Sequence, residues 1–75
     1  MPRYFFNVVD GQSLADSDGL DLADMAAARS MAIQTAGAML QDAGRAQWNG
    51  SEWQMRVTTD RKTVLSLNFS AVESA

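Results

Sequence analysis

Hydrophobic and polar positions divide the chain into strand-like runs at both ends and a helix-like run between them. From residue 3 to residue 9 the side chains alternate with a period of two, which predicts a β-strand. One face carries Tyr4, Phe6 and Val8, and the other carries Phe5, Asn7 and Val9. Because both faces are largely apolar, this strand either lies centrally in its sheet or leaves its second face open to a partner.

The segment after this strand is rich in turn-forming residues. Asp10-Gly11 is a strong turn signal, but a two-residue hairpin there would place Leu14 on the wrong face of the sheet. We therefore expect at most a short, irregular second strand near Gln12 to Ala15. A further turn at Asp18-Gly19 then leads the chain back toward the core.

The Ala- and Met-rich stretch from Asp24 to Gly44 predicts a single long helix. Asp24 is the expected N-cap, with Asp21 as the alternative, because a carboxylate accepts from the free N–H groups of the first turn. Gly44 is the expected stop. On a helical wheel, one arc collects the predicted core stripe: Met25, Ala28, Ala32, Ile33, Ala36, Met39, Leu40 and Ala43.

The opposite side of this helix is unusually bare of charge, because no residue from Ser30 to Gln41 is charged. Solvent-facing helix surfaces usually carry charged residues. The neutral helix face consists of Ala27, Ser30, Gln34, Gly37, Ala38 and Gln41. It is either an association surface or simply the outer side of an Ala-rich helix that tolerates a neutral face.

Two further strands are predicted at Glu52 to Thr58 and Thr63 to Phe69. Pairing Thr59 with Thr63 leaves a three-residue loop of Asp60, Arg61 and Lys62. This register brings three apolar pairs together: Val57 with Leu65, Met55 with Leu67, and Trp53 with Phe69.

These elements predict an α+β fold with the order β-(β)-α-β-β, in which one long helix packs on a three- to four-stranded, mostly antiparallel sheet. We expect the first strand to lie beside the last and antiparallel to it. Residues 1–75 form one domain, with 70–75 as a frayed tail.

On the sheet face away from the helix, Phe5, Val9 and Val64 form a second candidate surface, although a patch of this size is also normal on a monomer.

Composition narrows the function classes. The chain has no cysteine and no histidine, which excludes disulfides and the commonest zinc ligands. Because a domain of this size has a small core, oligomerisation is the remaining way to add stability. Six basic and nine acidic residues give a net charge of -3, which disfavours nucleic-acid binding. Neither a signal-like segment nor a membrane-spanning run is present, so we expect a soluble, cytoplasmic protein.

Candidate chemistry is sparse. The run from Asp16 to Asp21 resembles part of a calcium loop, but its spacing fails because Leu14 and Met25 would occupy ligand positions. The Ser and Thr residues lack an adjacent base, so the remaining catalytic alternative is a small carboxylate-dependent enzyme using the segment from Asp16 to Asp24. No cofactor, metal site or small-molecule ligand is expected.

A basic group, Arg56, Arg61 and Lys62, together with Trp48 and Trp53, could form a nucleic-acid face. The competing interpretation is a solvated hairpin tip with Trp53 in the core.

Several segments resemble a family of short uncharacterised bacterial proteins, a domain of unknown function: the MPRYFF opening, the turns at Asp10-Gly11 and Asp18-Gly19, and Leu22-Ala23-Asp24 ahead of an Ala-rich helix. The likeness covers nearly the whole chain and implies no activity, cofactor or catalytic residue. Members often carry His where this chain has Asn7, and more charge along the helix. This second departure makes the neutral helix face more particular to this chain.

These features favour a non-enzymatic protein-interaction module that self-associates, with a homodimer as the simplest form. The alternative is a nucleic-acid-linked or antitoxin-like regulator that uses the basic hairpin tip at residues 56–62. The expected partner is a second copy or another protein.

Overall fold

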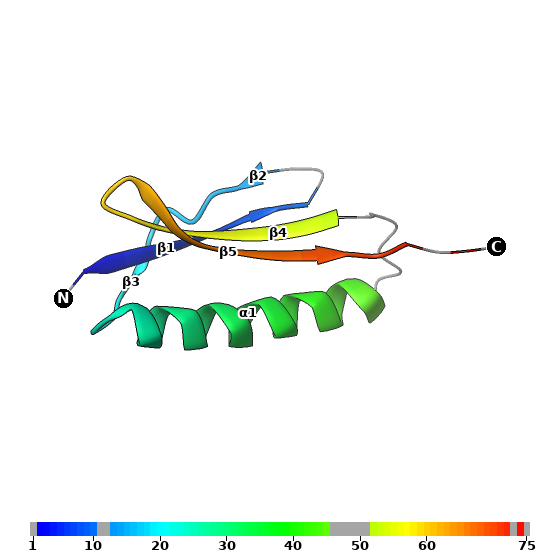
Figure 1. Ribbon diagram of the computed structural model, residues 1–75, viewed down its shortest axis with the longest axis horizontal. Coiled ribbons are helices and arrows are strands. Elements are labelled where there is room, and N and C mark those ends of the chain that lie inside the picture. The colour runs from blue at the N-terminus through cyan, green and yellow to red at the C-terminus, as the bar shows by residue number, and fades with distance from the viewer. Residues whose placement is uncertain (1, 11–12, 46–51, 73, 75) are drawn as a thin grey trace.

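The protein is a two-layer α+β domain in which one helix covers one face of an antiparallel sheet (Figure 1). The computed structural model describes residues 2–10, 13–45, 52–72 and 74, and the side chains of 43–45 are not included. The elements are β1 (Arg3–Val9), β2 (Ser13–Leu14), β3 (Leu20–Asp21), α1 (Met25–Arg45), β4 (Glu52–Thr59) and β5 (Lys62–Ser70). The predicted fold class is confirmed.

The sheet has the order β2-β1-β4-β5, with β3 also paired to β1. The predicted neighbour of β1 was wrong: β1 lies beside β4, and β5 is the edge strand. In this arrangement Phe6 lies opposite Val57 and Val8 lies opposite Met55, so these β1–β4 pairs on the core face are apolar. Since β1 and β5 are both antiparallel to β4, they run in the same direction.

The three predicted apolar pairs of the β4–β5 hairpin are confirmed, from Val57 opposite Leu65 to Trp53 opposite Phe69. The loop between the strands differs from the prediction. Thr59 pairs with Lys62, which leaves a two-residue turn, and a bulge between Val57 and Thr58 takes up Val64 as the extra residue. The turn is one residue shorter than predicted, and the bulge adds one residue to β5. Beyond the bulge the predicted register is therefore restored, and the apolar side chains stay on the core face.

The turn at Asp60-Arg61 has positive φ at both residues, 54° and 63°. Positive φ at both central positions is characteristic of a type I′ turn, whose twist matches that of the flanking strands. Neither residue is glycine, so the turn stores backbone strain.

The second strand predicted near Gln12 to Ala15 is confirmed as β2, with Val8 opposite Leu14. The third strand, β3, was not predicted, because two residues carry no usable alternation. It pairs Leu20 with Tyr4, and the N–H of Leu22 donates to the carbonyl of Pro2 at 3.1 Å. Together β2 and β3 occupy the same edge of β1.

The core lies between the helix and one sheet face. Its buried residues are Tyr4, Val8, Ala28, Ala32, Ala36, Trp53, Met55 and Val57. Two members of the predicted core stripe were wrong: Ile33 is 55% exposed and Met39 is 40% exposed. The alanines at four-residue spacing form the ridge that contacts the sheet, and Ile33 lies about 100° around the helix from Ala32. Ala43 lies outside the described side chains.

Both predicted helix ends can be compared with the structure. The Asp24 N-cap is confirmed, because its Oδ1 accepts from the N–H of Ala27 at 2.9 Å. The predicted stop at Gly44 was wrong by a short margin, since α1 continues to Arg45.

Replacing Arg61 with glycine is expected to stabilise the fold. Glycine adopts the positive φ at no steric cost, although it also gains freedom in the unfolded chain, so the net gain is about 0.5–1 kcal/mol. Urea unfolding measures the change. Lys62→Gly is the control, because a glycine in β5 relieves no positive φ and is expected to destabilise. A loss of stability in Arg61→Gly would contradict the turn assignment.

Candidate interaction surface

The neutral helix face lies on the side of α1 that points away from the sheet. It is largely accessible: Ser30, Gln34, Gly37, Ala38 and Gln41 are exposed, and Ala27 is half-buried. Within it, the side-chain amide of Gln34 donates to Oγ of Ser30 at 3.1 Å. The face is therefore neutral throughout, and its residues are small apart from Gln34 and Gln41.

Gly37 stands out within this face. It lies in the interior of α1, and a Cβ added there would meet nothing within 4 Å. Glycine at such a position costs about 1 kcal/mol relative to alanine. The described residues offer no packing reason for this cost, whereas close approach of another backbone would require a residue without a side chain.

One flank of α1 is covered by the sheet and the other is not. The helix lies over β4 and β5. The sheet continues to β1 beneath the flank on the β4 side, but it ends at β5 on the other flank. On the covered flank, Met31 and Thr35 are half-buried, whereas Ile33 is more than half exposed. Ile33 and Gly37, one helical turn apart, therefore lie on the flank that faces outward past β5.

The edge strand β5 carries edge protection only near its turn, where Lys62 begins the strand and the bulge lies. From Thr63 to Ser70 it contains no charged residue and no proline, and its one irregularity is the bulge near the turn. The core-facing Leu65 and Leu67 are only half-buried, and Phe69 is 41% exposed. Apolar surface therefore continues from the exposed flank of α1 onto this edge.

The other sheet edge is closed by a polar network. The N–H of Phe6 donates to Oδ2 of Asp16 at 3.1 Å, in the gap between β2 and β3. The N–H of Asp16 in turn donates to Oδ1 of Asn7 at 2.9 Å. The amide Nδ2 of Asn7 donates to the carbonyl of Arg56 and to Oγ1 of Thr58, both at 3.3 Å. Asn7 and Asp16 thus tie the closed edge to β4.

Asp16 also organises the turn that follows it. Its Oδ1 accepts from the N–H of Asp18 at 3.1 Å and from that of Gly19 at 3.2 Å. Partial burial by itself raises the pKa of the Asp16 carboxyl, but hydrogen bonds from the N–H groups of Phe6, Gly19 and Asp18 outweigh burial and hold the pKa below its usual value.

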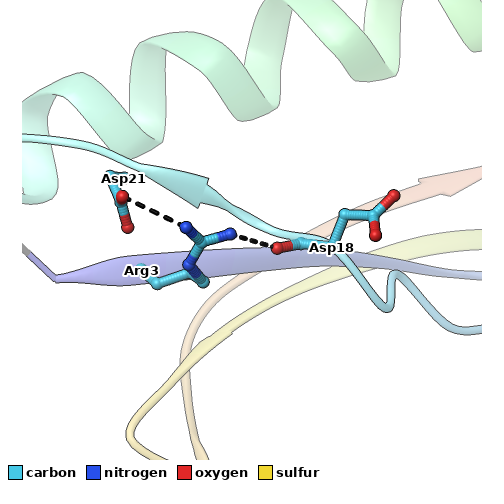
Figure 2. Close-up of polar contacts among 3 residues, drawn as sticks. All are labelled: Arg3, Asp18 and Asp21. Atoms are coloured by element: carbon cyan, nitrogen blue, oxygen red, sulfur yellow. Dashed lines mark hydrogen bonds and ion pairs between the residues drawn. The ribbon is translucent and has the colours of Figure 1, made fainter.

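Arg3 fastens the same turn to β1 (Figure 2). Its guanidinium donates to the carbonyl oxygen of Asp18 and forms an ion pair with Asp21 at 3.1 Å. Gly19 is required here, because its φ is 70° and a Cβ would lie 2.9 Å from both Phe5 and the carbonyl of Tyr4. The acidic segment thus serves as an edge cover.

The second candidate surface is less continuous than the sequence suggested. Phe5 and Val9 are half-buried, and Val64, at the bulge, is separated from them by β4. Polar side chains lie between them, including Gln54 and Arg56, whose Nε donates to the Gln54 amide oxygen at 2.9 Å.

The basic residues do not form one cluster at the hairpin tip. Arg61 and Lys62 are exposed at the turn, whereas Arg56 lies within β4, opposite Asn7. Trp53 is buried in the core and cannot stack on a base. Trp48 lies outside the described residues.

Depressions mark the surface of the described residues, and two of them border β4. One, of about 250 Å³, is lined by residues that include Asn7, Arg56 and Thr63. The other, of about 420 Å³, lies where β4 begins and includes Trp53 and Phe69. Among the described residues no group of three acidic, histidine or cysteine side chains could hold a metal ion. Within that same part of the chain, no helix has both the length and the apolarity needed to cross a membrane.

Three residues with clear structural roles escaped the sequence reasoning: Arg3, Asn7 and Asp16. The bonds of Asp16 to the N–H groups of Asp18 and Gly19 are local and fit the predicted turn, but the other partners are distant in the sequence, and no spacing rule predicts those bonds. The available signal for Asn7 was its position as a polar residue between the apolar residues Phe6 and Val8.

The geometry defines a small two-layer α+β domain with one closed and one open sheet edge. The family described as Domain of unknown function (DUF6894) matches residues 3–70, and the chain belongs to that family. This confirms the resemblance to an uncharacterised domain family. No curated protein and no solved structure matches the chain.

Replacing Asp16 with asparagine is expected to destabilise the protein by about 1–3 kcal/mol at pH 7, because charge-assisted hydrogen bonds to three backbone N–H groups are lost. The lowered pKa of Asp16 means that its contribution is complete above the unfolded-state value, about 3.9, and is lost as the pH falls through the folded-state value. Stability of the wild-type protein should therefore fall on acidification more steeply than that of Asp16→Asn.

Denaturant unfolding at a series of pH values measures both effects. Asp18→Asn is the matched control, because it removes the same charge from the same turn while the Asp18 side chain points away from Arg3 (Figure 2). Equal effects of the two substitutions would contradict a specific role for Asp16.

Proposed function

We propose that this protein is a small, non-enzymatic interaction module that self-associates in the cytoplasm, with a homodimer as the simplest form. The observation that carries the proposal is the exposed, uncharged helix face with Gly37 at an open position. Helices approach each other closely where their side chains are small and neutral, and the exposed Ile33 beside Gly37 supplies apolar area to bury.

The small core supports the same proposal. Among the described residues, three of the eight buried core residues are alanines, which contribute little apolar area each. A chain of 75 residues without cysteine has few ways to add stability, and association that buries Ile33 and the half-covered leucines of β5 is one of them.

The structural bonds of the carboxylates support the proposal that the protein is not an enzyme. Asp16 accepts backbone N–H groups, Asp21 pairs with Arg3, and Asp24 caps α1. These side chains are occupied with structural bonds, which leaves little support for a carboxylate-dependent enzyme. The nucleic-acid alternative has less support as well, because Arg56 is separated from Arg61 and Lys62 and the net charge is -3.

Gly37→Glu is expected to convert the associated wild-type protein into a monomer, because it places a charge and a long side chain on the proposed contact surface. Glutamate has a higher helix propensity than glycine, so the fold itself should not suffer. Light scattering after size exclusion, over a concentration series, measures the mass.

The control is Leu14→Glu on the closed edge, where Leu14 is 59% exposed. It adds the same charge to a comparably accessible site and should leave the mass unchanged. A wild-type protein that is monomeric at all concentrations would refute the proposed function.

A further inference from the structure

The two edges of the sheet have opposite chemical characters. The outer side of β1 is covered by β2, by β3 and by the Asp16 carboxylate, which accepts the N–H of Phe6 in the gap. No strand among the described residues pairs with the outer side of β5. From Thr63 to Ser70 this edge is uncharged and proline-free, which makes it a template for pairing with another strand.

The direction of the backbone groups along β5 follows from its orientation. In β1 the core-facing Phe6 directs its N–H toward the β2 side of the sheet. Because β5 runs in the same direction as β1, its core-facing residues direct their N–H groups the same way, toward β4. Ser66 and Asn68, which alternate with them, therefore direct their N–H and C=O groups outward.

We propose that the outer edge of β5 pairs with β5 of a second copy in antiparallel fashion, which joins two sheets into one across a twofold axis. This inference rests on the proposed self-association and names its geometry. An antiparallel pair of identical strands is self-complementary, so the same strand of each subunit can form the interface.

The pattern of β5 favours a register centred on Leu67. In that register Ser66 lies opposite Asn68 of the second copy, and their outward backbone groups form the hydrogen-bonded pairs. On the core side, Leu67 meets its own symmetry mate and Leu65 meets Phe69, so every core-side pair is apolar. The absence of charge between Thr63 and Ser70 means that no like charges oppose each other.

The helix position fits the same assembly. Strands in a sheet are about 4.8 Å apart, and α1 lies over β4 and β5. A helix midway between these strands lies about one strand spacing from the twofold axis, so the two helix axes would be about 10 Å apart. Packed helices lie about 8–10 Å apart. Pairing of β5 therefore brings the Ile33 and Gly37 flanks of two helices into contact.

Ser66→Pro tests the inference in the full chain. Proline removes the outward N–H of Ser66 and no bond of the β4–β5 ladder, so the monomer should fold. The dissociation constant of the dimer should rise about tenfold or more, because two symmetry-related hydrogen bonds are lost and the ring obstructs the partner strand. Ser66→Ala, which keeps the N–H, should associate like the wild-type protein.

Hydrogen exchange of the wild-type protein gives a second readout that does not depend on the folding of a variant. The amides of Ser66 and Asn68 should exchange fast at low concentration and become protected as the dimer forms. A dimer with unprotected amides at these positions, or a folded Ser66→Pro that still dimerises, would overturn the edge pairing but leave self-association intact. A wild-type monomer at all concentrations would overturn both.

Discussion

Close contact between an alanine ridge and a sheet is the constraint on which this domain depends. Ala28, Ala32 and Ala36 let α1 lie directly on the strands, where Met55 and Val57 are completely buried beneath it. Larger side chains on this ridge would lift the helix and open cavities around the two β4 residues. The cost of using alanine is a thin core, and the larger apolar side chain of Ile33 remains outside it.

Because the core is thin, the interactions at the two sheet edges are important for the stability of the domain. The β1 edge is covered through Arg3, Asn7 and Asp16. Their hydrogen bonds join β1 to the turn at Asp18-Gly19 and to β4. The other edge ends at β5 with half-covered leucines. A domain that protects one edge with a polar network and leaves the other neutral is asymmetric in a way that suits association through the open side.

The acidic segment illustrates how local chemistry can be mistaken for a functional motif. Carboxylates and a glycine between residues 16 and 21 resemble an ion-binding loop, yet Asp16 binds backbone N–H groups and Asp21 binds Arg3. Gly19 is needed because its positive φ and the nearby Phe5 ring leave no room for a side chain. The function that these residues serve is closure of an edge.

The sequence alone determined the elements whose periodicity is long and regular: β1, the long helix with its Asp24 cap, and the apolar register of the β4–β5 hairpin. It also located the neutral helix face, because charge is a local property. Strand order was beyond it, since several pairings of β1 bring apolar residues together and only the complete packing selects β4. The same holds for the exposure of Ile33 and for the Asn7–Asp16 network, because burial and long-range hydrogen bonds depend on which strands end beside the helix.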